Sequence, residues 1–151
     1  MEFRILGPIE VVDDERAIAL GPSQQRAVLA ILLLHVNEVV SRDRLIEDLW
    51  GERAPATAAT ALHGYVSQLR KVLEPSNGAE RRVLITRAPG YLLELDPSQV
   101  DLQRFESLVR RGRQQLARGE AEAAAATLAE ALSLWRGPPF AEFGSVPFAL
   151  A

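Results

Sequence analysis

The chain has 151 residues, of which 48% are hydrophobic and 25% are charged, and its formal net charge is −3 at pH 7. This composition is that of an ordinary folded protein and excludes the disordered and fibrous classes. The chain contains no cysteine and no apolar run long enough to span a bilayer, which excludes disulfides and thiolate metal sites and predicts a cytoplasmic protein.

The beginning of the chain predicts three short strands, FRIL (3–6), IEVV (9–12) and AIAL (17–20). Gly7-Pro8 and a polar turn at 13–16 separate them. A helix is expected from residue 23 to about 36, with Ser23 as its N-cap. Its middle part, 27–34, is apolar nearly all round, so other elements must cover it on several sides.

Two further helices and a hairpin are expected next. Ser41 can cap the second helix, whose apolar face consists of Leu45, Ile46, Leu49 and Trp50, and Gly51 and Pro55 end it. The third helix is predicted over 56–73 and is closed by Pro75. A polar loop (75–80) then leads to a hairpin with strands 82–86 and 91–95 around the turn 87–90.

A change of composition after Asp96 indicates a linker over 96–99 and two units, 1–96 and 97–151. Residues 100–135 are alanine-rich and predicted to be helical, with a break near Gly119. Small and large residues there fall at the packing positions of a tetratricopeptide repeat: Gly112, Ala124, Leu128 and Ala131. Because a helix pair of this kind needs neighbours and a new apolar segment opens at Trp135, we expect the chain to be part of a longer protein.

The third predicted helix has two faces of opposite character. Leu62, Val66, Leu69 and Leu73 form a buried stripe at helical spacing. The opposite face carries hydrogen-bonding groups and cations, with Arg70 nearer the core edge: Thr60, His63, Gly64, Ser67, Gln68, Arg70 and Lys71. Such side chains read base edges and phosphates in a major groove, although they also make an ordinary solvated surface. Gly64 fits either a close approach to DNA or to a packed neighbour, or a tolerated surface glycine.

The surroundings of this helix favour DNA. Between residues 60 and 91 five basic residues (Arg70, Lys71, Arg81, Arg82 and Arg87) stand against Glu74 and Glu80, a local charge of +3 in an acidic chain. A short helix, a turn, a longer helix with a polar face and a basic hairpin predict a winged helix-turn-helix. In that fold the third helix enters the major groove and Arg87 is placed to enter the minor groove, unless it is an ordinary turn arginine.

Residues for catalysis are scarce. His35 and His63 lie on different predicted helices, with no carboxylate or thiol at ligand spacing. There is no glycine-rich phosphate loop and no nucleophile motif. We therefore expect no enzyme, no catalytic residue, no metal and no cofactor. A protein-interaction module built on a winged helix and a helical repeat stays open as the alternative to DNA binding, because the total charge is acidic.

Four stretches resemble the winged-helix domain of a known family: FRILGPIEV, SQQRAVLAILLL, LIEDLWGERAPATAATALHGYVSQLRKVLEP and ITRAPGYLLEL. The family is that of the SARP or AfsR-type transcriptional activators of Streptomyces and other actinobacteria. Residues 100–143 are similar to the start of the bacterial transcriptional activation domain that follows in that family.

The resemblance implies an α+β fold of the OmpR type, with an N-terminal sheet, three helices and a hairpin wing. An incomplete α-helical, tetratricopeptide-like segment would follow. It also implies an activator that binds direct repeats in promoter DNA as a dimer, recruits RNA polymerase and its sigma factor, and controls antibiotic or secondary-metabolite genes. Such a protein would be nucleoid-associated and would not use a membrane.

The resemblance also implies roles for particular residues. The loop of Gly51, Glu52, Arg53 and Ala54 would face polymerase. The DNA-contacting positions would be Thr60, His63, Gly64, Ser67, Gln68, Arg70, Lys71 and, in the wing, Arg87. Many OmpR-type relatives carry arginines where this chain has Ser67 and Gln68, so specificity here would depend more on neutral contacts and on DNA shape.

Overall fold

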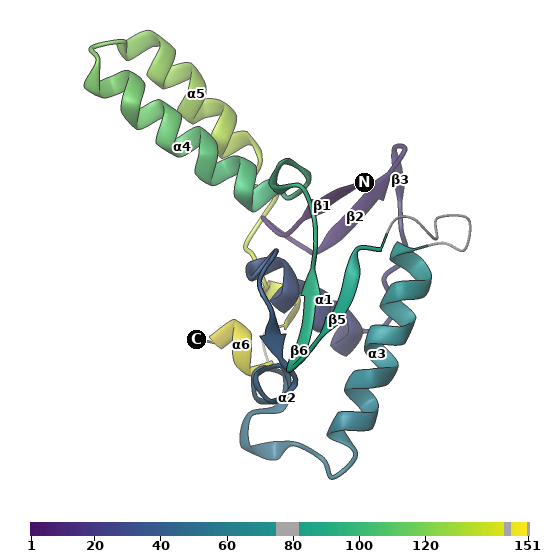
Figure 1. Cartoon of the computed structure of the whole chain (residues 1–151). Helices are drawn as coiled ribbons and strands as arrows, with labels where there is room; N and C mark the ends of the chain where they lie inside the picture. Colours follow the sequence, from purple (N-terminus) through teal and green to yellow (C-terminus); the bar gives the residue numbers. More distant parts are fainter. Residues whose placement is uncertain (75–81, 144–145, 151) are drawn as a thin grey trace.

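The computed structural model describes residues 1–74, 82–143 and 146–150, and it confirms the predicted α+β arrangement. A winged-helix unit is followed by a helix pair (Figure 1). The elements are β1 (Glu2–Arg4), β2 (Glu10–Asp13), β3 (Arg16–Ala17), α1 (Ser23–Leu34), β4 (Val40–Ser41), α2 (Arg42–Trp50), α3 (Ala58–Leu73), β5 (Leu84–Arg87), β6 (Gly90–Leu93), α4 (Asp101–Ala117), α5 (Ala121–Ser133) and α6 (Pro147–Leu150). None of these helices is long and apolar enough to cross a membrane.

The N-terminal sheet pairs β1 with β2 and β2 with β3, all antiparallel. The third strand was predicted over residues 17–20. The structure has it shorter and one residue earlier, over Arg16–Ala17. The last bond to the sheet is donated by the Ile18 amide to the Val11 carbonyl, at 2.8 Å. Beyond it, Leu20 is buried in the core and its carbonyl accepts a hydrogen bond from the Gln25 side chain on α1. Tertiary packing therefore draws residues 18–20 out of the strand.

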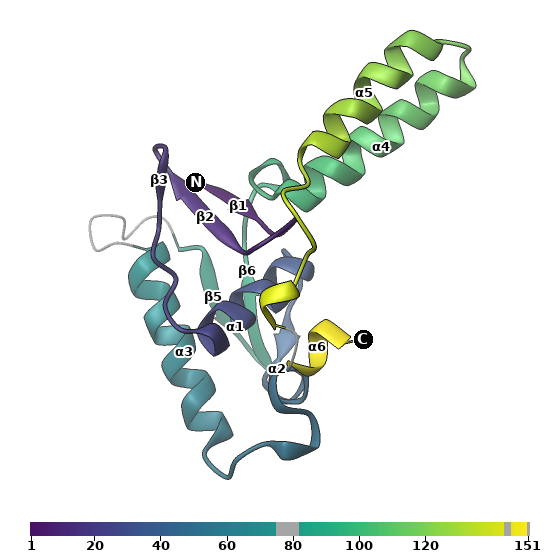
Figure 2. The same cartoon turned by 180° about the vertical axis from the view of Figure 1, so that it is seen from behind.

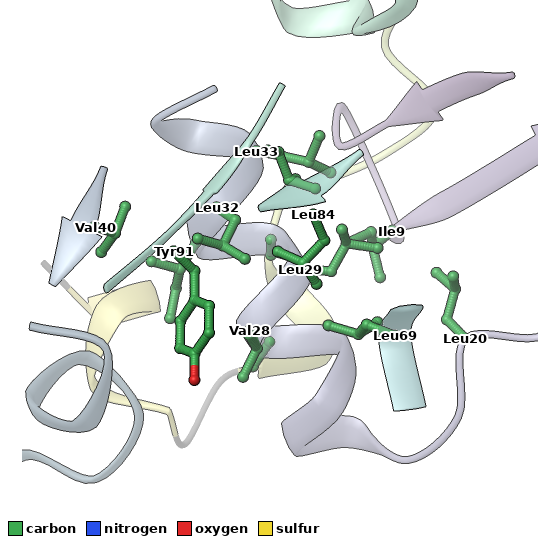
Figure 3. Close-up of a cluster of buried hydrophobic side chains, with 14 of the residues drawn as sticks. Ile9, Leu20, Val28, Leu29, Leu32, Leu33, Val40, Leu69, Leu84 and Tyr91 are labelled. Carbon is green, nitrogen blue, oxygen red and sulfur yellow. The ribbon is translucent and has the colours of Figure 1, made fainter. Parts of the chain in front are cut away.

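Helix α1 forms the centre of the core, as its apolar sequence predicted. Every residue from Ala27 to Leu33 is at most 1% exposed. Figure 3 shows Val28, Leu29 and Leu32 of α1 together with Leu69 of α3 and with Leu84 and Tyr91 of the hairpin. Helix packing on one side and the hairpin on another bury α1 almost completely.

Helix α1 begins at Ser23 as predicted, but its predicted cap and its predicted C-terminal end were wrong. Ser23 is not the N-cap, because it is already the first helical residue and Pro22 occupies the cap position without a side-chain bond. The Pro22 carbonyl accepts the Arg26 amide, so the first turn closes one residue earlier than predicted. The helix ends at Leu34 instead of residue 36, where the His35 amide bonds back to Leu32.

Helix α2 begins as predicted, because the Ser41 hydroxyl accepts the Arg44 amide at 3.0 Å. Helix α3 ends at Leu73 as predicted but begins at Ala58 instead of residue 56. The Ala58 amide bonds to the Pro55 carbonyl, so residues 55–57 form a turn before the helix. The predicted closure at Pro75 and the polar loop 75–80 lie outside the described residues.

The hairpin β5–β6, which we call the wing (residues 84–93), is confirmed with a shorter turn than predicted. Arg87 pairs with Gly90, so the turn consists of Ala88 and Pro89. A strand that the sequence did not indicate, β4, extends the sheet in the order β4, β6, β5. Gly90 allows this pairing, because a Cβ atom at its position would lie 1.9 Å from the Val40 carbonyl oxygen.

Helices α4 and α5 lie side by side and project from the rest of the molecule (Figure 1). The predicted packing positions are confirmed, since Gly112, Ala124 and Ala131 are buried between the two helices. A Cβ at Gly112 would lie 2.6 Å from a methyl carbon of Leu128. The break at Gly119 is also confirmed, but the second helix ends at Ser133.

Both ends of the helix pair are attached to the same N-terminal turn. The Asp101 side chain, 2% exposed, accepts the amides of Ile5 (2.8 Å) and Leu6 (3.1 Å). The Leu6 carbonyl in turn accepts the Arg136 amide at 2.8 Å. Gly7 allows Arg136 to pass this close to the N-terminal turn, because a Cβ at Gly7 would lie 3.0 Å from the Arg136 Cβ.

The residues after α5, 136–143 and 146–150, form what we call the return segment, because they lead back to the winged helix (Figure 2). Phe143, 1% exposed, lies in the same core cluster as α1. Glu142 accepts the Ile9 amide at 2.6 Å and forms an ion pair with Arg26. The division of the chain near residue 96 stays a prediction, and the structure adds that the return segment packs on the first unit.

Candidate nucleic-acid interface

The outward surface of α3 is formed by residues spaced three and four apart, and we call it the reading face. Its members Thr60, His63, Gly64, Gln68 and Lys71 are exposed. Ser67 is half-buried among them. The sequence of α3 contains no aspartate or glutamate, so Lys71 gives the face a positive charge. The structure therefore brings together six of the predicted contact positions on one surface.

Gly64 lies at the middle of the reading face. In the described part of the chain, a Cβ built at this position meets no heavy atom within 4 Å apart from its chain neighbours and the backbone of its own helix. A packed neighbour within these residues is therefore not the reason for the glycine. Close approach to DNA and simple tolerance of a surface glycine stay open.

Arg70, also predicted as a DNA contact, is turned toward the wing. Its Nε donates to the Leu84 carbonyl at 3.0 Å, and a terminal nitrogen donates to the Thr86 hydroxyl. Its guanidinium carbon lies 6.0 Å from the centre of the Tyr91 ring. Arg70 is thus half-buried between α3 and the wing, apart from the reading face.

The tip of the wing carries Arg87, which is exposed as predicted. A second exposed cation that the sequence did not single out, Arg42, begins α2 beside it. The Arg42 amide donates to the Pro89 carbonyl at 3.2 Å, and its guanidinium lies 5.5 Å from the Tyr91 ring centre. Only the pairing of β4 with β6 brings Arg42 to the wing, and β4 is too short to leave a sequence signal.

The loop predicted to face polymerase begins with a 3-10 turn over Gly51–Arg53. Glu52, Arg53 and Ala54 are exposed. Pro147 of α6 lies next to Gly51, the first residue of this loop: its Cγ would be 3.4 Å from a Cβ built at Gly51. Arg81 and Glu80, which contributed to the predicted local charge, lie outside the described residues. Among the residues that are described, no group of His, Asp or Glu could hold a metal ion.

An exposed, acid-free third helix beside a cationic hairpin defines a winged-helix regulatory protein, and comparisons with known proteins agree with this class. Residues 15–93 match the family described as "Transcriptional regulatory protein, C terminal", and residues 100–151 match the bacterial transcriptional activator domain. The chain belongs to the SARP or AfsR-type family of transcriptional activators, whose members are regulators and not enzymes.

Individual relatives match nearly the whole chain. It is 37% identical to the transcriptional regulatory protein MoaR1 of Mycobacterium tuberculosis, over 98% of this chain and 48% of the relative. It is 34% identical to the regulatory protein DnrI of Streptomyces peucetius, over 91% of this chain and 52% of the relative. The chain therefore spans about half the length of these two relatives.

A solved structure shares the fold over the whole chain. The structure of Mycobacterium tuberculosis EmbR in complex with a low affinity phosphopeptide superposes with a TM-score of 0.93 at 37% sequence identity. The match covers 99% of this chain and 39% of the EmbR chain. The winged helix, the helix pair and the return segment thus have counterparts in one solved relative.

Proposed function

We propose that the chain is the DNA-reading part of a transcriptional activator. The reading face of α3 would enter the major groove, and Arg87 at the tip of the wing would enter the neighbouring minor groove. The observation that carries the proposal is the acid-free, exposed reading face beside an exposed wing arginine. Roles in DNA contact for Thr60, His63, Gly64, Ser67, Gln68, Lys71 and Arg87 are part of this proposal.

The finer features of the family are proposed with it. The chain would bind direct repeats in promoters as a dimer, and the loop at Gly51–Ala54 would contact RNA polymerase or its sigma factor. The exposure of Glu52 and Arg53 supports such a contact. Antibiotic or other secondary-metabolite genes would be the targets.

A second candidate function is the docking of a protein partner on the helix pair. It is favoured by three exposed apolar side chains on or next to these helices, Leu132 at 66%, Leu116 at 59% and Trp135 at 39%. Apolar side chains gathered at the surface are a common feature of docking sites. This candidate is compatible with DNA reading, because the helix pair projects away from α3 (Figure 1).

Selection of random duplexes bound by the chain, followed by sequencing, tests the proposal. At about 0.15 M salt nonspecific binding is weak, so enrichment reports specific contacts. Enriched direct repeats are expected, and their spacing gives the arrangement of two copies. If no sequence is enriched by this chain, the selection is repeated with a longer chain that continues past Ala151. If nothing is enriched then either, the DNA-reading proposal is wrong and the docking of a protein partner is the remaining candidate function.

Lys71→Ala is expected to weaken binding to every duplex and to lower the slope of log affinity against log salt by about 0.9. The reason is that a lysine on a phosphate displaces about one counterion. The slope is measured by titrating labelled duplex between low and moderate salt. Arg113→Ala, which removes an exposed cation from α4, is the control and leaves the slope unchanged. An unchanged slope for Lys71→Ala would exclude Lys71 from the phosphate contacts.

Gln68→Ala is expected to cost about 1–3 kcal/mol of binding free energy on the selected duplex and little on random DNA, because a glutamine that reads an adenine edge is sequence-specific. His63→Ala gives the same pattern if His63 also reads a base. The measurement compares the affinities of each variant for the selected and the random duplex. Equal losses on both would assign the residue to the DNA backbone instead.

A further inference from the structure

The outer edge of the wing is held by side chains from the C-terminal end of α3 and from the cap residue that follows it. Within the described residues β5 is the outer strand of its sheet, in the order β4, β6, β5. The backbone of an outer strand has amides and carbonyls without strand partners, and these groups need other partners when they are buried. Leu84 is 1% exposed, so its backbone amide and carbonyl are buried and need hydrogen-bond partners other than a neighbouring strand.

Arg70 in the last turn of α3 and Glu74, the C-cap residue that follows the helix, satisfy these groups. The carboxylate of Glu74 accepts the amides of Val83 (2.9 Å) and Leu84 (2.7 Å). Arg70 donates to the Leu84 carbonyl at 3.0 Å. Both backbone polar groups of Leu84 are therefore bound by side chains, one from α3 and one from the residue that caps its C-terminal end.

Arg70 reaches further along the wing than Glu74 does. Its terminal nitrogen donates to the hydroxyl of Thr86, next to Arg87, and its guanidinium also lies over Tyr91 on the second strand of the wing. The planar fork of an arginine spreads its donors over three nitrogens and can lie flat on a ring, whereas all donors of a lysine sit on a single nitrogen. Arg70 thus joins α3 to both strands of the wing.

We propose that Arg70 is a positioning residue that fixes the wing at a set distance and angle from the reading face, and that it does not touch DNA itself. This inference rests on the proposed function. A regulator that places α3 in one groove and Arg87 in the next needs the two to be held at a fixed separation. The bond to Thr86 transmits the position of α3 to the residue beside Arg87.

A double-mutant cycle between Arg70 and Arg87 tests the proposal on the selected duplex. If Arg70 acts through the wing, Arg70→Ala weakens binding about as much as Arg87→Ala does, and the double variant binds no more weakly than Arg87→Ala alone. The salt slope of Arg70→Ala then equals that of Arg87→Ala, and the double variant lowers it no further. Additive losses, with a slope for the double variant lower by about one than that of Arg87→Ala, would make Arg70 a phosphate contact and overturn the proposal.

Two variants separate positioning from loss of folding or charge. Thr86→Val removes the acceptor and leaves the charge of Arg70 in place, and it is expected to weaken binding in the same direction as Arg70→Ala. Arg70→Lys keeps the charge but loses the fork, so it does not restore binding. Restored binding by lysine, or undiminished binding by Thr86→Val, would contradict the positioning role.

Hydrogen exchange without DNA separates this inference from the proposed function. In Arg70→Ala the amides of the wing, residues 84–93, are expected to exchange faster, while those of α1 stay as protected as in wild type. Unchanged exchange in the wing would overturn the positioning role whatever the DNA results are. Faster exchange in the wing together with no duplex bound by the wild-type chain would overturn DNA reading and leave the attachment itself established.

Discussion

Phe143→Ala should lower the free energy of unfolding by about 3–5 kcal/mol, as large-to-small changes of a buried phenylalanine do. The side chain is 1% exposed and packs on Phe148, with ring centroids 5.5 Å apart, in the core cluster that contains α1. Because stabilities of natural domains are about 5–15 kcal/mol, this loss is a large fraction of the total. Urea unfolding followed by circular dichroism measures it.

A matched control for this variant lies on the helix pair. Leu132 is apolar and 66% exposed, so Leu132→Ala should change the unfolding free energy by about 0.5 kcal/mol or less. If Phe143→Ala unfolded at the same urea concentration as wild type, the return segment would not be part of the winged-helix core.

Gly90→Ala should destabilise the wing by about 1–3 kcal/mol or more and remove duplex binding. An added Cβ would lie 1.9 Å from the Val40 carbonyl oxygen and 2.7 Å from the Ser41 Cα. Both are backbone atoms, so relief requires β4 and β6 to separate, and overpacking of this kind is costly. Thermal unfolding and duplex titration on one protein sample measure the two effects.

Gly64→Ala is the matched control, with the opposite expected sign. It changes the same residue type in an open position, and alanine favours an exposed helix by about 1 kcal/mol over glycine. A more stable variant that binds DNA poorly would identify Gly64 as a close approach to DNA. A Gly90→Ala variant as stable as wild type would contradict the close pairing of β4 and β6.

Most helices and strands were predicted correctly, because the spacing of apolar residues along the chain decides which segments form helices and which side of each is buried. The stripe Leu62, Val66, Leu69 and Leu73 identified α3 and its buried side, and all four side chains are buried. The hydroxyl of Ser41 identified the start of α2. The end of β3 was misplaced because burial of Leu20, a contact at a distance, ends the strand. The cap and the C-terminal end of α1 and the start of α3 were misplaced because local turns set them within one or two residues.

The parts of the structure that the sequence did not reveal depend on contacts between distant residues. Asp101 binds amides 96 and 95 positions away, and Glu142 binds the Ile9 amide 133 positions away. A single acidic residue gives no local sign of such a partner. Gly7-Pro8 was recognised as a turn, but its closeness to Arg136 could not be foreseen from the pattern.

The candidate site divides in the same way. Exposure of the reading face followed from the position of its residues on the helix, and the structure places them as expected. Arg70 was placed near the core edge by the same reasoning, but its bonds to Leu84 and Thr86 depend on how the wing folds back. Arg42 was missed because a strand of two residues brings it to the wing.

The shared anchor at Leu6 ties both ends of the helix pair to one residue of the winged-helix unit. The Leu6 amide is bound by Asp101, where the pair begins, and its carbonyl by Arg136, where the chain comes back. A helix pair whose two ends meet at one residue can become longer or shorter while the core of the winged helix stays unchanged. A chimera joined near residue 96 would separate the winged helix from Phe143, which belongs to its core. A transplanted winged helix therefore has to carry the return segment as well.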